Sequence, residues 1–186
     1  MLITPNDFHK GVVIEYDGSL WQVVDYQHTK IAQAKAFVAT KIKNLKTGQV
    51  LEKKFDSEEK FKRAIIETKP MQLLYRDSEA IYLMDNETFE QYSIPLEAVR
   101  RELGFIKDGD TVDVMFYEGN PIGISLPPTV TLKVEYTEKA VKGDRVSTVM
   151  KPATLETGIT INVPIFVDIG DSVVVNTETG EYVSRA

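Results

Sequence analysis

The run Val-Val-Ile-Glu-Tyr-Asp-Gly-Ser-Leu-Trp-Gln-Val-Val, residues 12–24, carries a clear local fold signal. Residues 12–16 and 20–24 are rich in β-branched and aromatic side chains, and Asp17-Gly18 separates them. Asp and Gly tolerate the positive φ angles that a two-residue hairpin turn requires. The run therefore predicts a β-hairpin.

The residues on either side extend this pattern. Upstream, Thr4-Pro5 followed by Asp7 and Gly11 predicts one capped helical turn. Downstream, residues 36–45 and 50–55 predict a second strand pair, and residues 61–64 end a small barrel of short strands. Within 36–45, period-two alternation puts Lys41 and Lys43 on the face of Phe37, opposite Val38 and Ile42.

The remainder of the chain also reads as short strands. They are predicted at residues 71–75, 80–84, 112–117, 121–126, 130–136, 159–163, 172–176 and 182–183. One helical segment begins at Pro95 and is followed by Gly104, and Pro127-Pro128 indicates a linker or a domain edge. Short strands at spacings of roughly ten residues are typical of all-β barrels or sandwiches, so a doubly wound nucleotide-binding fold is not expected.

Composition excludes several classes of protein. The chain has 186 residues, no Cys and two His, His9 and His28. Thiolate metal sites, disulfides and Cys nucleophiles are therefore excluded, and few His side chains are available for a His-based metal site or a catalytic triad. The longest apolar run, residues 80–84, is far shorter than the ~18 residues of a membrane span, and residues 1–10 lack a signal-peptide core. We expect a cytoplasmic protein without a metal.

Enzyme signatures are also missing from the sequence. It contains no glycine-rich phosphate loop, no G-x-S-x-G and no H-E-x-x-H. The pair Asp108-Gly109-Asp110 is better explained as a turn than as a catalytic carboxylate pair.

Charge is distributed unevenly along the chain. The net charge is −6, yet residues 28–54 hold seven Lys against one Glu, and residues 77–118 hold eleven acids against three basic residues. A basic first third can approach phosphates while an acidic middle stays away from them. The alternative is an asymmetry that serves only solubility.

The segment 28–35, His-Thr-Lys-Ile-Ala-Gln-Ala-Lys, is a candidate functional loop. It connects two predicted strands, carries Lys30 and Lys35, and is longer than a hairpin connection needs to be. Such loops commonly carry function, although a plain solvated turn is the alternative.

Several longer motifs resemble a known family. They are residues 44–48 (Asn-Leu-Lys-Thr-Gly), 85–92 (Asp-Asn-Glu-Thr-Phe-Glu-Gln-Tyr), 142–144 (Lys-Gly-Asp), 151–158 (Lys-Pro-Ala-Thr-Leu-Glu-Thr-Gly), 163–167 (Val-Pro-Ile-Phe-Val), 170–171, 176–177 and 180–185. Together they resemble bacterial elongation factor P from end to end. The resemblance implies three small β-barrels in an elongated, tRNA-like arrangement: an SH3-like (KOW-type) barrel at 1–64 and OB-folds at 65–127 and 128–186.

The resemblance also implies a function. A member of this family is a cytoplasmic translation factor that binds the ribosome beside peptidyl-tRNA and relieves stalling at consecutive prolines. Its partners are ribosomal RNA, ribosomal proteins and peptidyl-tRNA. It acts as a monomer without a catalytic residue, cofactor, metal, membrane or small-molecule substrate, by positioning the reacting ends.

The resemblance further points to site residues. The loop that faces peptidyl-tRNA corresponds to His28, Lys30, Ala32, Gln33, Ala34 and Lys35. Lys41 and Lys43 are candidate contacts to tRNA or ribosomal RNA phosphates, with solubilising lysines as the alternative. A loop of the C-terminal barrel, which in relatives reaches towards the messenger codon, corresponds to Gly143, Asp144 and Arg145.

Both of these loops depart from the family pattern. Relatives carry a modified Lys or Arg between small residues at the tip, where this chain has Gln33 between two Ala, and Ala restricts positive φ. After Asp144, relatives continue with Thr and a glycine-containing stretch, whereas this chain continues with Arg145-Val146-Ser147. Two alternatives therefore stand beside a working elongation factor: a diverged paralogue with a narrower or regulatory ribosomal role, and a general RNA-binding OB-fold protein.

Overall fold

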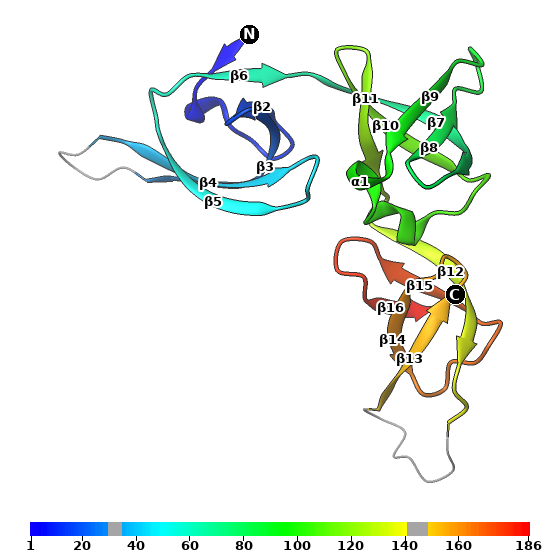
Figure 1. Cartoon of the computed structure of the whole chain (residues 1–186). Coiled ribbons are helices and arrows are strands. Elements are labelled where there is room, and N and C mark those ends of the chain that lie inside the picture. The colour runs from blue at the N-terminus through cyan, green and yellow to red at the C-terminus, as the bar shows by residue number, and fades with distance from the viewer. Residues whose placement is uncertain (30–34, 141–148) are drawn as a thin grey trace. The chain divides into compact units, whose positions relative to one another are not determined.

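The computed structural model describes residues 1–29, 35–140 and 149–186. Most regular structure in these residues is β-strand, arranged in three sheets (Figure 1). The all-β fold class predicted from the sequence is confirmed. The described chain divides into two compact units, residues 1–69 with 114–123 and residues 70–113 with 124–186.

The first sheet has six strands in the order β1-β6-β2-β3-β4-β5. Its elements, with the 3-10 helix η1, are β1 (Leu2–Ile3), η1 (Pro5–Asp7), β2 (Val13–Tyr16), β3 (Ser19–Thr29), β4 (Phe37–Asn44), β5 (Val50–Asp56) and β6 (Phe61–Ala64). The predicted hairpin at 12–24 is confirmed as β2–β3, with φ 49° at Asp17 and 71° at Gly18. The predicted helical turn is η1, which Thr4 and Asp7 cap.

The core of this sheet is strongly aromatic. It contains Ile3, Phe8, Val12, Ile14, Trp21, Val23, Ile42, Phe55 and Phe61. The rings of Phe55 and Phe61 meet edge to face with centroids 4.9 Å apart, a favourable aromatic geometry. Trp21, expected to be a core residue, is 6% exposed, and its indole N–H donates a hydrogen bond to the carbonyl of Tyr16 at 3.1 Å.

The second sheet has five strands in the order β11-β10-β7-β8-β9. Its elements, with two short helices, are β7 (Ile66–Arg76), β8 (Ala80–Met84), β9 (Gln91–Pro95), α1 (Leu96–Val99), η2 (Glu102–Phe105), β10 (Thr111–Tyr117) and β11 (Asn120–Ser125). Strand β9 was not predicted, because Pro95 was assigned to a helix start. β9 is an edge strand, where the missing N–H of a proline costs little.

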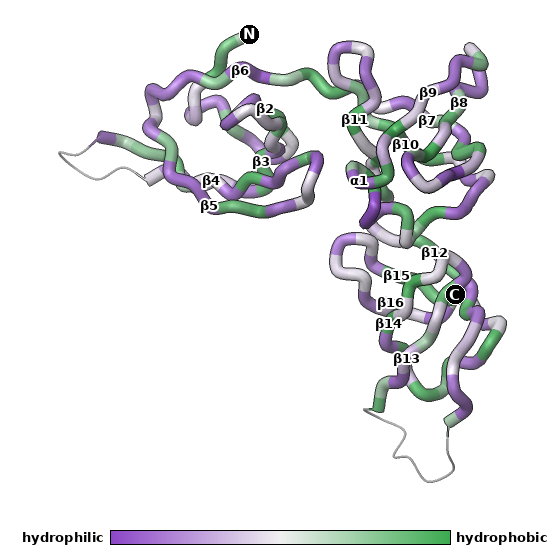
Figure 2. Tube along the Cα trace, in the orientation of Figure 1, coloured by the Kyte–Doolittle hydropathy of each residue, from purple (hydrophilic) through white to green (hydrophobic). Residues whose placement is uncertain are grey.

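The third sheet has the order β14-β13-β12-β15-β16. Its strands are β12 (Thr129–Thr137), β13 (Met150–Leu155), β14 (Thr160–Pro164), β15 (Ser172–Asn176) and β16 (Tyr182–Arg185). The sequence does not predict β13, which contains Pro152; this residue pairs with Asn162 of β14 and lies beyond the last pair of β13 with β12, where a proline is tolerated. Alternating apolar and polar residues, which the colour changes along the tube in Figure 2 follow, put one face of β12 and β15 into the core.

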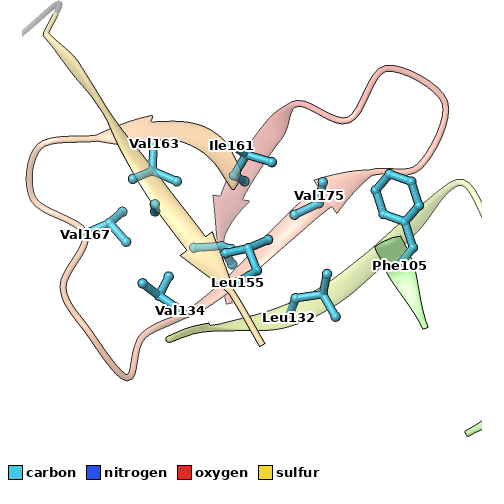
Figure 3. Close-up of a cluster of buried hydrophobic side chains, with 10 residues drawn as sticks. Phe105, Leu132, Val134, Leu155, Ile161, Val163, Val167 and Val175 are labelled. Atoms are coloured by element: carbon cyan, nitrogen blue, oxygen red, sulfur yellow. The ribbon is translucent and has the colours of Figure 1, made fainter. Parts of the chain in front are cut away.

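A phenylalanine from η2 completes the core of this third sheet. Phe105 is 8% exposed and packs with residues of β12 to β15 and of the β14–β15 connection, namely Leu132, Val134, Ala153, Leu155, Ile161, Val163, Val167, Val173 and Val175 (Figure 3). Two polar contacts accompany it: Thr157 Oγ1 donates to the carbonyl of Gly104 at 2.6 Å, and Arg101 Nη2 donates to the carbonyl of Thr177 at 2.7 Å. The helix predicted between Pro95 and Gly104 is therefore two short helices, the second of which includes Gly104 and ends in a core residue.

No helix in the part of the chain that the structure describes is both long and apolar enough to cross a membrane.

Candidate functional site

The candidate loop connects β3 to β4, the two longest neighbouring strands of the first sheet. The end of β3 lies at the left of the first sheet in Figure 1, and β5 pairs with β4 as far as Phe37 with Asp56. The last cross-strand pairs before the connection are His28 with Val38 and Thr29 with Phe37. β3 is therefore longer than the predicted strand at 20–24, because pairing with β4 carries it to Thr29. His28 belongs to the strand rather than to the loop.

Only part of the predicted site lies in the described residues. Lys30, Ala32, Gln33 and Ala34 of the tip, and Gly143, Asp144 and Arg145 of the C-terminal loop, lie outside them. The other predicted residues, His28, Lys35, Lys41 and Lys43, all lie on or beside β3 and β4.

His28 and Lys35 flank the loop with different contacts. The His28 ring meets the Tyr26 ring edge to face, with centroids 5.6 Å apart. The Lys35 Nζ lies 3.5 Å from Asp56 Oδ2, and its side chain is 86% exposed. The pKa of Asp56 is lowered, mainly by the backbone N–H of Glu58 and further by Lys35. A pair this exposed holds Lys35 weakly, so its ammonium group can exchange the carboxylate for another anion.

Lys41 lies in a row of alternating charge. The strand register pairs it with Asp25 on β3 and with Glu52 on β5. The predicted face is confirmed, because Lys41 is exposed while Val38 and Ile42 are buried. Its two carboxylate neighbours lower the local positive potential, which weakens the case for Lys41 as a phosphate contact.

Lys43 has uncharged neighbours instead. It is half-buried and pairs with Gln22 and with Val50. Its role as a phosphate contact stays a prediction.

Two further basic residues on β5 were not singled out from the sequence. Lys54 pairs with Ala39, and its Nζ lies 5.3 Å from the centroid of the Phe37 ring. Lys53 precedes it in the strand and is also exposed. The sequence shows these residues as the adjacent basic pair Lys53-Lys54. Only strand pairing brings Lys54 beside an aromatic ring next to the candidate loop.

These strands frame a surface hollow with a volume of about 390 Å³. Its lining residues are Asp25, Tyr26, Gln27, Ala39, Thr40, Lys41, Glu52, Lys53 and Lys54. Three ammonium groups against two carboxylates leave a small excess of positive charge. The arrangement can bind anions, and in the described residues no three His, Cys, Asp or Glu side chains group to hold a metal.

Three family models together match most of the chain. Residues 4–61 match the model of the elongation factor P (EF-P) KOW-like domain, residues 66–124 that of the elongation factor P (EF-P) OB domain, and residues 130–185 that of the elongation factor P C-terminal region.

Individual proteins agree with the family models. The chain is 48% identical over 185 residues to elongation factor P of Dictyoglomus thermophilum, covering 100% of both chains. It is equally similar to elongation factor P of Dictyoglomus turgidum.

Solved structures share the fold. Eukaryotic translation initiation factor 5A from Methanococcus jannaschii superposes with a TM-score of 0.53 at 18% identity, over 67% of this chain and 92% of that one. A translation initiation factor eif-5a family protein from Naegleria fowleri gives 0.54 at 12% identity, over 68% and 96% of the two chains. At these identities the likeness concerns the fold alone.

Proposed function

Because the chain belongs to the elongation factor P family, a family of translation elongation factors, we propose that it binds the ribosome next to peptidyl-tRNA and stimulates peptide-bond formation at consecutive prolines. The observation that carries the proposal is the 48% identity over the full length of both chains. An RNA-binding protein that shared only an OB-fold would match over one barrel, so the general RNA-binding alternative is disfavoured.

The factor contributes position rather than a covalent step. Holding two reacting groups in attack geometry is worth up to about 7–11 kcal/mol in the best model reactions, and proline is a substrate that reaches this geometry poorly. The segment 28–35 faces peptidyl-tRNA in this proposal, with His28 and Lys35 at its base. Cationic side chains on β4 and β5 then contact RNA phosphates, and residues 143–145 face the messenger.

Translation of a template with three consecutive proline codons tests the proposal. We expect the purified protein to raise the yield of full-length product several-fold in a reconstituted system that lacks such a factor. A template with alanine codons in place of the prolines is the control and should not respond. An unchanged yield from the proline template would contradict the proposal and favour a diverged paralogue with a narrower role.

The role of the tip is tested by adding the charge that relatives carry there. We expect Gln33→Lys to equal or exceed the wild type on the proline template. Gln49→Lys is the matched control, because Gln49 is an exposed residue of the β4–β5 turn, at the end of β4 opposite the tip and outside the lining of the hollow, and it receives the same charge. If both variants gain activity equally, general charge rather than tip position is responsible.

Modification of the tip is a separate question. Gln33 has no amine to acylate or alkylate, so we expect protein purified from its own host to have the mass of the unmodified chain. Added mass that maps to Lys30 or Lys35 would contradict this expectation and would identify a substitute for the usual tip residue.

Phosphate contacts are tested by the salt dependence of ribosome binding. Each lost contact lowers the slope of log affinity against log salt by about 0.7–0.9. We expect Lys41→Ala with Lys43→Ala to flatten the slope less than Lys53→Ala with Lys54→Ala, since Lys41 lies between two carboxylates. Unchanged slopes in both double variants would remove this face from the proposed interface.

A further inference from the structure

One hairpin turn recurs in each of the three sheets. In the β4–β5 turn, the side-chain oxygen of Asn44 accepts hydrogen bonds from the backbone N–H groups of Lys46 and Thr47 at 2.8 and 3.0 Å. Gly48 N–H donates to the Asn44 carbonyl at 2.9 Å, and Gln49 N–H donates to Thr47 Oγ1 at 3.3 Å. Gly48 has φ 74°, a left-handed conformation that glycine adopts readily.

The β15–β16 turn repeats each of these bonds. Asn176 accepts from the N–H groups of Glu178 and Thr179 at 2.8 and 3.0 Å. Gly180 N–H donates to the Asn176 carbonyl at 2.8 Å, and Glu181 N–H donates to Thr179 Oγ1 at 3.2 Å. Gly180 has φ 76°.

The β8–β9 turn has the same bonds but a different residue at the left-handed position. Asp85 accepts from the N–H groups of Glu87 and Thr88 at 2.8 and 3.3 Å. Phe89 N–H donates to the Asp85 carbonyl at 2.8 Å, and Glu90 N–H donates to Thr88 Oγ1 at 3.4 Å. Phe89 has φ 59°. A phenylalanine therefore occupies the conformation for which the other two turns use glycine.

The fold does not account for this phenylalanine. A left-handed φ is sterically unfavourable for a bulky residue, and Phe89 is 71% exposed, so its ring is not part of the core. At Gly48 and Gly180 a Cβ would meet nothing within 4 Å. Glycine therefore suits these positions because of the backbone φ angle and not because a side chain would clash. The turn forms without an aromatic side chain twice in the same molecule. The ring of Phe89 thus brings the strain of a left-handed φ without a place in the core.

The surroundings of Phe89 indicate the chemistry of its partner. Residues 85–90 contain three carboxylates and no Lys or Arg. Glu90 also accepts a hydrogen bond from the Tyr92 hydroxyl at 2.8 Å. Carboxylates repel nucleic-acid phosphates, and they attract ammonium and guanidinium groups. An exposed aromatic ring on a hydrogen-bonded loop is also typical of an interface anchor, because the loop is ordered before binding.

We propose that Phe89 anchors a protein–protein contact, in which its ring enters an apolar pocket rimmed by Lys or Arg on a basic protein segment. This inference rests on the proposed function, because the basic segment is expected to belong to a protein of the ribosome. It assigns the β8–β9 turn, at the end of that hairpin in Figure 1, to a ribosomal protein rather than to RNA.

Binding of purified ribosomes by Phe89→Gly tests the anchor. We expect its affinity to fall about 30-fold or more, the loss that defines an interface hot spot, while its thermal midpoint does not fall. Phe89→Asn, which also tolerates a left-handed φ, is expected to lose the same affinity, and Phe89→Tyr to retain it within threefold. Phe166→Ala is the matched control, because Phe166 lies between β14 and β15 of the third sheet and is 52% exposed, and it should bind within twofold of the wild type. Wild-type affinity in Phe89→Gly, or an equal loss in Phe166→Ala, would overturn the inference.

Photo-cross-linking identifies whether the partner of Phe89 is protein or RNA. A benzoylphenylalanine introduced at position 89 should cross-link to a ribosomal protein at a Lys- or Arg-rich segment. Cross-linking to ribosomal RNA, or no cross-link from protein that is bound to the ribosome, would overturn the inference and leave the proposed function standing. Failure of the wild type to bind ribosomes would overturn both.

Discussion

Replacing Phe105 with alanine removes the one core side chain that η2 contributes to the third sheet's cluster. Phe105 is 8% exposed, and its ring packs near Leu132 and Val175 (Figure 3). Buried Phe-to-Ala changes cost about 3–5 kcal/mol, from lost transfer free energy and from the cavity that remains. Because the half-buried Leu126 and Ile159 lie against the same cluster and can move into the space, we expect the lower part of this range, about 3–4 kcal/mol.

Amide hydrogen exchange measured by mass spectrometry resolves this loss by region. A decrease of about 3–4 kcal/mol in opening free energy speeds exchange about 150- to 900-fold in β14 and β15. Phe61→Ala is the matched control: Phe61 is 5% exposed in the core that contains Trp21, so it should change the fluorescence transition of Trp21. Phe105→Ala should leave that transition in place.

Two results would refute this reasoning. The first is a loss below about 1 kcal/mol in β14 and β15, which would mean that the Phe105 ring does not support this core. The second is a shift of the Trp21 transition by Phe105→Ala as large as that caused by Phe61→Ala, which would mean that the variant destabilises the chain without regional selectivity.

Three further changes have defined outcomes. Gly104→Ala would place its Cβ 2.6 Å from Ile159 Cγ2, so we expect the free energy of unfolding in urea to fall by about 1–3 kcal/mol. Ile159→Ala in the same chain should partly reverse this loss, and additive losses in the double variant would contradict the clash. The pKa of the Glu15 carboxyl is lowered from 4.5, first by the Tyr117 hydroxyl, so the ionised carboxylate stabilises the fold above pH 4.5, and this stabilisation is lost as pH falls through the lowered pKa. Glu15→Gln should therefore flatten the fall in stability between pH 5 and 3, measured by tryptophan fluorescence. An unchanged profile would argue against a stabilising bond between Glu15 and Tyr117. Thr177→Val removes a buried hydroxyl that donates to the Pro127 and Pro128 carbonyls and should cost about 1–3 kcal/mol in urea unfolding, whereas Thr177→Ser, which keeps the donor, should cost clearly less.

Local chemistry made much of the fold predictable. Asp17-Gly18 specifies its turn because the two residues in sequence tolerate the two positive φ angles that the turn requires. The alternation in residues 36–45 fixed which face of β4 is buried, because side chains alternate along any strand. Pro95 and Pro152 argue against strands, yet each lies where the strand is paired on one side only: β9 is an edge strand, and Pro152 pairs with β14 but lies beyond the last pair of β13 with β12.

The candidate site was predictable in part. The segment 28–35 stood out by its length and its lysines, and the family by motifs that are contiguous in sequence. The carboxylates on both sides of Lys41 and the ring beside Lys54 depend on strand register, which joins residues that are distant along the chain.

The amino-acid sequence by itself determined the all-β class, most of the strands and the family of this protein, because turn preferences, side-chain alternation and motif matches are properties of neighbouring residues. Only the tertiary structure decided that Phe105 belongs to the core of the third sheet, and that Phe89 takes the left-handed place that Gly48 and Gly180 take elsewhere. Core membership follows from packing between segments far apart in sequence, and a φ angle follows from the closed hydrogen bonds of a turn. Neither can be read from the identity of a residue alone.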